Sequence, residues 1–85
     1  MKVAVFDTYV TKKSGEIMHF DILVPLGTEE SQVHVFGQQY LRSKGLPDLP
    51  LSTQQCKFCH IEYASQEVID KIDAMGFSIL ELEHC

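Results

Sequence analysis

Two segments with strand-like patterns open the chain. Residues 2–10 are apolar at most positions and rich in β-branched and aromatic side chains, which predicts a well-buried strand. Residues 16–24 alternate instead. One side of this strand carries Met18, Phe20, Ile22 and Val24, and the other carries Ile17, His19, Asp21 and Leu23. Lys12-Lys13-Ser14-Gly15 lies between the segments as a turn, so we expect a β-hairpin.

Two later segments have apolar residues at helical spacing. The first is predicted to start at an N-cap Thr28 and to end at Lys44 and Gly45. Its buried stripe is Val33, Phe36, Tyr40 and Leu41, and Gly37 beside the stripe would permit a close backbone contact. The second helix is predicted to run from an N-cap Ser65 to Gly76, with Val68, Ile69, Ile72 and Met75 buried.

The remaining segments complete one small domain. Residues 46–51 contain two prolines and are expected to form a rigid connector. Residues 56–63 and 77–83 are predicted as the third and fourth strands. We therefore expect a single α+β domain over residues 1–85, in which an N-terminal β-hairpin is followed by α-β-α-β. The expected sheet is mixed and four-stranded, with both helices packed on it.

The charge of the chain narrows the classes of partner. The formal net charge is −5 over 85 residues, and no stripe of Lys and Arg offsets it, so nucleic-acid binding is not expected. No apolar run approaches the length of a membrane span, and no signal-peptide pattern follows Met1, which predicts a cytoplasmic protein. Three cysteines in such a compartment suggest free thiols or a metal site rather than a disulfide framework.

A group of cysteines and histidines is the first candidate for chemistry. Cys56, Cys59 and His60 lie together, and His84 and Cys85 end the chain. These residue types are zinc ligands, but Cys56 and Cys59 would point to opposite sides of a strand, so a zinc site needs a turn between them. The pair also allows thiol redox chemistry, and buried, inert cysteines remain the simplest alternative.

The hairpin offers a second candidate, which depends on the strand register. With a three-residue loop at 13–15, Asp7 lies opposite Asp21 and Tyr9 lies opposite His19, on one face. Such a cluster could bind a metal or carry out acid–base chemistry. With a four-residue loop, Asp7 would face Phe20 and the cluster would not form.

The sequence also resembles a known family. The segments AVFDTYV (Ala4 to Val10), MHFDILVP (Met18 to Pro25) and CKFCHIEYA (Cys56 to Ala64), with their spacing to GFSILELEHC (Gly76 to Cys85), are similar to the bacterial domain of unknown function 2024 family. The resemblance covers essentially the whole chain. It implies a compact α+β protein with no assigned activity, and it supplies no site residues.

Two classes of function are consistent with these features. The first is a small binding or interaction protein with a protein partner or a second copy of itself, and a homodimer is possible. The second is a zinc-binding or thiol-redox protein that uses the Cys/His group. An enzyme is not favoured, because a chain of this length rarely encloses a ligand-sized pocket.

Overall fold

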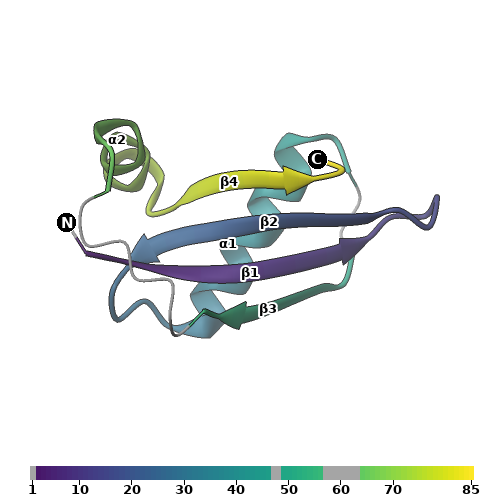
Figure 1. The fold of residues 1–85 in the computed structure, drawn as a ribbon, viewed down its shortest axis with the longest axis horizontal. Coiled ribbons are helices and arrows are strands. Elements are labelled where there is room, and N and C mark those ends of the chain that lie inside the picture. Colours follow the sequence, from purple (N-terminus) through teal and green to yellow (C-terminus); the bar gives the residue numbers. More distant parts are fainter. Residues whose placement is uncertain (1, 47–48, 57–63) are drawn as a thin grey trace.

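The computed structural model describes residues 2–46, 49–56 and 64–85, and Figure 1 shows their arrangement. The strands are β1 (Val3–Thr11), β2 (Ile17–Pro25), β3 (Leu51–Gln55) and β4 (Ser78–Glu83), and the helices are α1 (Glu30–Ser43) and α2 (Gln66–Met75). The strands form one four-stranded sheet in the order β3-β1-β2-β4. The predicted α+β fold and the order of its elements are confirmed.

The sheet is antiparallel at every described pairing, whereas a mixed sheet was expected. β1 pairs with β2 and β3, and β2 pairs with β4, all in antiparallel orientation. The hairpin occupies both central positions, so a chain that crosses from β2 through α1 reaches the far side of β1. β2 and β3 therefore run parallel without being neighbours, and the helical connections create no parallel pair.

The turn of the hairpin has the three-residue form. The Lys12 amide donates to the Glu16 carbonyl at 2.8 Å, and the Gly15 amide donates to the Lys12 carbonyl at 2.9 Å. Gly15 has φ 92°, a left-handed conformation that glycine adopts without steric cost. Thr11 is consequently paired with Ile17, and the register that places Asp7 opposite Asp21 is confirmed.

The main core lies between α1 and one face of the sheet. The even-numbered residues of the hairpin point to this face, and the predicted stripe of α1 covers them. The buried cluster includes Phe6, Val10, Met18, Phe20, Ile22, Val24, Val33, Phe36, Tyr40 and Leu41. Gly37 lies so close to the sheet that an added Cβ would be 2.9 Å from Leu51 Cδ2, so the expected close contact is present.

The second helix covers only one end of the opposite face (Figure 1). Ile72 packs there with Val3, Val5 and Leu23, which are odd-numbered residues of the hairpin. Of the stripe predicted for α2, Ile72 alone is buried, and Met75 is 51% exposed. The prediction of four buried residues was wrong for Met75, because the helix sits at the end of the sheet and faces it with little more than one turn.

Two element boundaries also differ from those expected. The third strand is Leu51–Gln55, which begins at the last residue of the segment predicted as a connector. Its mostly polar sequence has no clear strand pattern. Residues 57–63 of the predicted third strand lie outside the described residues. Helix α1 has Glu29 as its N-cap without a side-chain cap, while Thr28 Oγ1 donates to the Pro25 carbonyl at 2.8 Å. Thr28 therefore closes the turn after β2 rather than capping the helix.

Gly76 ends α2 as predicted, and it allows a test of the packing between the two helices. It has φ 88°, and an added Cβ would lie 3.0 Å from Phe36 Cζ, in a ring that stacks on Phe77 with centroids 4.6 Å apart. Gly76→Ala should lower the free energy of unfolding by about 2 kcal/mol, from backbone strain and this contact together.

Gly15→Ala is the matched control, because Gly15 has φ 92° with no atom within 4 Å of an added Cβ. It should cost about 1 kcal/mol in urea unfolding, from backbone strain alone. Equal losses for the two variants would show that the Phe36 contact contributes nothing.

Candidate functional site

In the described part of the chain, one face of the sheet is only partly covered by the two helices. α1 covers the opposite face, and α2 reaches only the end that carries Val3, Val5 and Leu23. Beyond α2, the same face presents Asp7 and Tyr9 from β1 and His19 and Asp21 from β2. Because side chains on alternate positions of a strand share a face, the register alone brings these four polar groups together.

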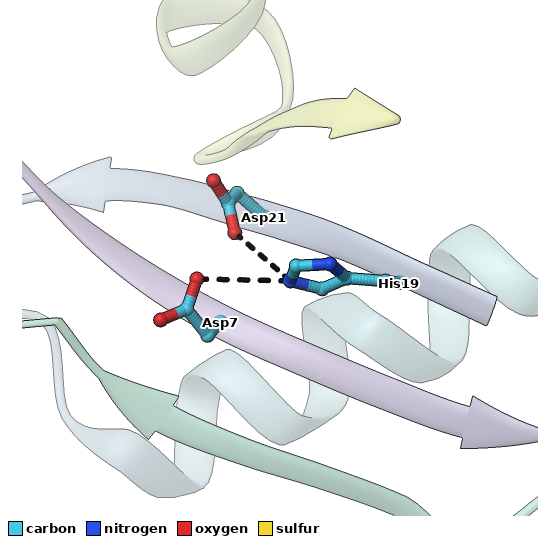
Figure 2. A group of neighbouring side chains, drawn as sticks. All are labelled: Asp7, His19 and Asp21. Atoms are coloured by element: carbon cyan, nitrogen blue, oxygen red, sulfur yellow. Dashed lines mark ion pairs between the residues drawn. The ribbon is translucent and has the colours of Figure 1, made fainter. Parts of the chain in front are cut away.

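Asp7, His19 and Asp21 form a compact group, which we call the hairpin triad (Figure 2). His19 Nε2 lies 3.8 Å from Asp7 Oδ1 and 4.0 Å from Asp21 Oδ1. One ligand atom from each residue lies within 4.8 Å of the other two. Among the described residues, this is the one group of three or more His, Cys, Asp or Glu side chains close enough to share a metal ion.

Two atoms of the triad are buried without a hydrogen bond in the described part of the chain. They are His19 Nε2 and Asp21 Oδ1, and they face one another across the 4.0 Å gap. Buried polar atoms are nearly always paired, and an unpaired one costs about 1–3 kcal/mol. These two atoms and Asp7 Oδ1 converge on a common point, where the Asp7 and Asp21 carboxyls can hydrogen-bond to each other only when one of them is protonated.

Tyr9 fixes the orientation of the imidazole. The rings of Tyr9 and His19 are stacked with centroids 4.3 Å apart and planes 9° apart. The two residues are directly opposite each other in the register, which is the geometry in which cross-strand rings pack best. The stack holds Nε2 toward the two carboxylates, so Tyr9 acts through His19 rather than as a ligand.

The pKa of Asp21 is raised from 3.8 to about 6. Burial is the largest cause, the neighbouring Asp7 carboxyl raises the pKa further, and His19 opposes the shift. The Asp21 side chain is 13% exposed, compared with 41% for Asp7. Two carboxylates in opposite positions cannot both ionise at ordinary cost, and the more buried one keeps its proton to higher pH.

The described members of the Cys/His group are not gathered into one site. The Cys56 amide donates to the Val5 carbonyl, and Cys56 packs beside the Val3 and Val5 end of the sheet. Cys85 Sγ lies 3.4 Å from the carbonyl of His19, which is paired with Tyr9, four residues along β1 from Val5. That interval corresponds to about 13 Å of extended chain, too far for shared coordination.

Other features of the group differ from expectation as well. Cys56 is disulfide-bonded, although free thiols were predicted, while Cys85 has a free thiol. His84 Nδ1 lies 3.2 Å from Glu16 Oε2, at the hairpin turn. Cys59 and His60 lie outside the described residues. The described residues give no support to zinc binding by Cys56 together with His84 and Cys85.

A second polar cluster has a structural role. Tyr40 donates a hydrogen bond to Glu81, and Lys44 Nζ lies 2.7 Å from the same carboxylate. These contacts join α1 to the edge strand β4 and hold the pKa of Glu81 below its usual value, with Lys44 as the largest cause. Glu81 thereby anchors the edge strand while 46% of its side chain stays exposed.

Comparison with known proteins agrees with this fold. Residues 1–82 match the family described as domain of unknown function (DUF2024). The chain belongs to this family. No curated protein matches the chain. The family resemblance inferred from the three sequence segments is thus confirmed, and it assigns no activity.

A solved structure to which the chain is similar is that of protein NE1680 from Nitrosomonas europaea, determined by NMR. It is 33% identical, covers 100% of this chain and 99% of its own, and superimposes with a TM-score of 0.82. The DUF2024 fold described above therefore has an experimental counterpart over its whole length. In the described part of this family member, no helix is long and apolar enough to cross a membrane.

The raised pKa of Asp21 predicts a pH dependence of stability. A carboxyl whose pKa is higher in the folded state favours folding at low pH, and this contribution is lost as the pH rises from 3.8 to about 6. Asp21→Asn mimics the protonated side chain and removes the loss. In metal-free buffer, the variant should be more stable than wild type by about 1–3 kcal/mol at pH 7.5, and close to it at pH 3.5.

Urea unfolding at the two pH values measures this difference, with Asp73→Asn as the matched control. Asp73 is exposed on α2, so its variant should follow the wild type at both pH values. A stability gain of Asp21→Asn that is the same at pH 3.5 and 7.5 would contradict the assignment.

Proposed function

We propose that this DUF2024 protein is a divalent-cation-binding protein, and that Asp7, His19 and Asp21 are its ligands. The observation that supports the proposal is the convergence of the two buried, unpaired atoms, His19 Nε2 and Asp21 Oδ1, with Asp7 Oδ1. A cation at the common point would satisfy all three atoms at once. The proposal belongs to the metal-binding alternative left open by the sequence, at the hairpin cluster instead of the Cys/His group.

The spacing of the three atoms is suited to a metal ion. Hydrogen-bonded nitrogen and oxygen atoms lie about 2.7–3.2 Å apart. Ligand atoms around a tetrahedral zinc ion, with bonds of about 2.0–2.2 Å, lie about 3.3–3.6 Å apart. The observed 3.8 and 4.0 Å exceed that range by a few tenths of an ångström. Small rotations of the side chains would close the difference.

Electrostatics favours a cation over a neutral ligand. Asp7 and Asp21 are directly opposite each other, and their repulsion is one cause of the raised pKa of Asp21. A divalent ion neutralises both carboxylates and removes the repulsion. The net charge of −5 also attracts cations to the chain at long range.

The types of ligand select among metals. Two carboxylates and one imidazole form a mixed oxygen and nitrogen set, which suits Zn²⁺, Mn²⁺ and Fe²⁺ better than Ca²⁺ or Cu⁺. Among these, Zn²⁺ binds mixed sites most tightly in general, so it is the ion for the first test. A protein that supplies three ligands leaves a fourth tetrahedral position for water or another molecule.

Self-association is the other expectation from the sequence, and it stays a prediction. The face that carries the triad also exposes Tyr9, Ile17 and Leu80, at 46%, 51% and 50%. A homodimer that covered these side chains would melt at a temperature that rises with protein concentration.

Calorimetric titration of metal-free protein with Zn²⁺ tests the proposed site. We expect one ion per chain and a higher melting temperature in excess Zn²⁺, because a ligand of the folded state alone stabilises it. Asp21→Asn and His19→Ala should each weaken Zn²⁺ binding by about 100-fold or more. Loss of a group that only orients a ligand already costs 10- to 100-fold.

Two control variants make the outcome specific. Asp73→Asn removes the same formal charge as Asp21→Asn, but from the exposed surface of α2. This variant should bind Zn²⁺ like wild type. Cys56→Ser distinguishes zinc binding by the triad from zinc binding by the Cys/His group. Zinc binding that is lost in Cys56→Ser but kept in Asp21→Asn would refute the proposed ligands.

A further inference from the structure

A pocket of about 420 Å³ opens between α2 and the sheet, on the same face as the hairpin triad. Its lining includes Leu23 from β2, Val68 and Lys71 from α2, and Leu80 from β4. The walls are mostly apolar, and the volume is within the range of about 300–1,000 Å³ that small-molecule sites have. A pocket of this size was not expected in so short a chain.

None of the triad residues lines the pocket, but two of its lining residues are neighbours of Asp21. Leu80 is the cross-strand partner of Asp21, and Leu23 follows Asp21 by two residues on β2. Directly opposed residues have Cβ atoms about 4.5–5.5 Å apart, and residues two apart on a strand share a face about 7 Å apart. The apolar wall therefore begins at the side of the carboxylate that would bind the metal.

The hairpin triad and the neighbouring pocket are suited to bind different parts of one ligand. The triad would supply three ligands to a cation, which would leave a coordination position for a further ligand. Two aspartates and one divalent ion have no net charge together, so an anionic group can complete the shell without facing an excess of negative charge. The pocket lining carries one positive and one negative side chain, Lys71 and Glu67, so it adds no net charge of its own.

We infer that the pocket holds the hydrocarbon part of a small carboxylic acid whose carboxylate completes the coordination shell of the triad-bound cation. The inference rests on the proposed function, since the carboxylate needs the cation. It identifies the ligand by class as a short apolar monocarboxylate. Binding involves no covalent step.

The test uses the full chain loaded with Zn²⁺ and follows the side-chain methyl signals of Leu23, Val68 and Leu80 by NMR. Acetate, butanoate and hexanoate are titrated in turn. Each methylene that enters an apolar pocket should strengthen binding about fourfold. Without Zn²⁺, hexanoate should bind at least tenfold more weakly.

Two variants probe the pocket itself. Val68→Phe fills it and should weaken hexanoate binding at least tenfold, with acetate and Zn²⁺ affinities unchanged. Val35→Phe makes the same change on α1, at a site that is 43% exposed, and should bind all three like wild type. Leu80→Ala, at a position that is 50% exposed, gives a second test by removing part of the wall without adding bulk.

The outcomes separate this inference from the proposed function. Absence of Zn²⁺ binding at the triad would remove both. Zn²⁺ binding with equal affinities for acetate and hexanoate would overturn the inference alone, as would hexanoate affinities that neither Val68→Phe nor Leu80→Ala changes. Hexanoate binding of equal strength with and without Zn²⁺ would also overturn it, because the carboxylate would then not contact the cation.

Discussion

The turn at residues 13–15 sets the register on which the rest of the molecule depends. The Lys12 amide bonds to the Glu16 carbonyl, and Gly15 takes the left-handed conformation that lets the loop close in three residues. Every even-numbered side chain of the hairpin then points toward α1, and every odd-numbered one points away. A shift of one residue would exchange the two sets and place Asp21 in the apolar core.

This dependence explains how much of the hairpin could be predicted from the sequence: its two strands and its turn, with two registers left open. Gly15 limits the possible turns. Because residues 16–24 have one apolar side, the three-residue and four-residue loops place different side chains opposite each other. Helix α1 was predictable for the same reason, because its stripe has to match an apolar sheet face. Family membership agrees with that reading and adds a solved relative that is 33% identical.

The errors have physical causes of a different kind. Strand β3 has the sequence LSTQQ and forms because β1 offers it free backbone groups, not because its side chains alternate clearly. Met75 continues the apolar stripe of α2 past the point where the sheet ends. Among candidate sites, the cysteines were conspicuous by residue type and close in sequence. The hairpin triad could be predicted only from the strand register, since Asp7 and Asp21 are distant along the chain.

The location of the triad within the sheet has a consequence for its dynamics. All three residues belong to β1 and β2, which are the two central strands. Proteins open locally from their less stable segments, and an edge strand such as β4 can detach while the centre stays folded. Fraying of β4 would carry Leu80 away and widen the pocket, yet the three polar side chains would keep their places. The polar side chains of the face therefore lie on the two central strands, whereas Leu80 lies on an edge strand that is held to α1 through Glu81.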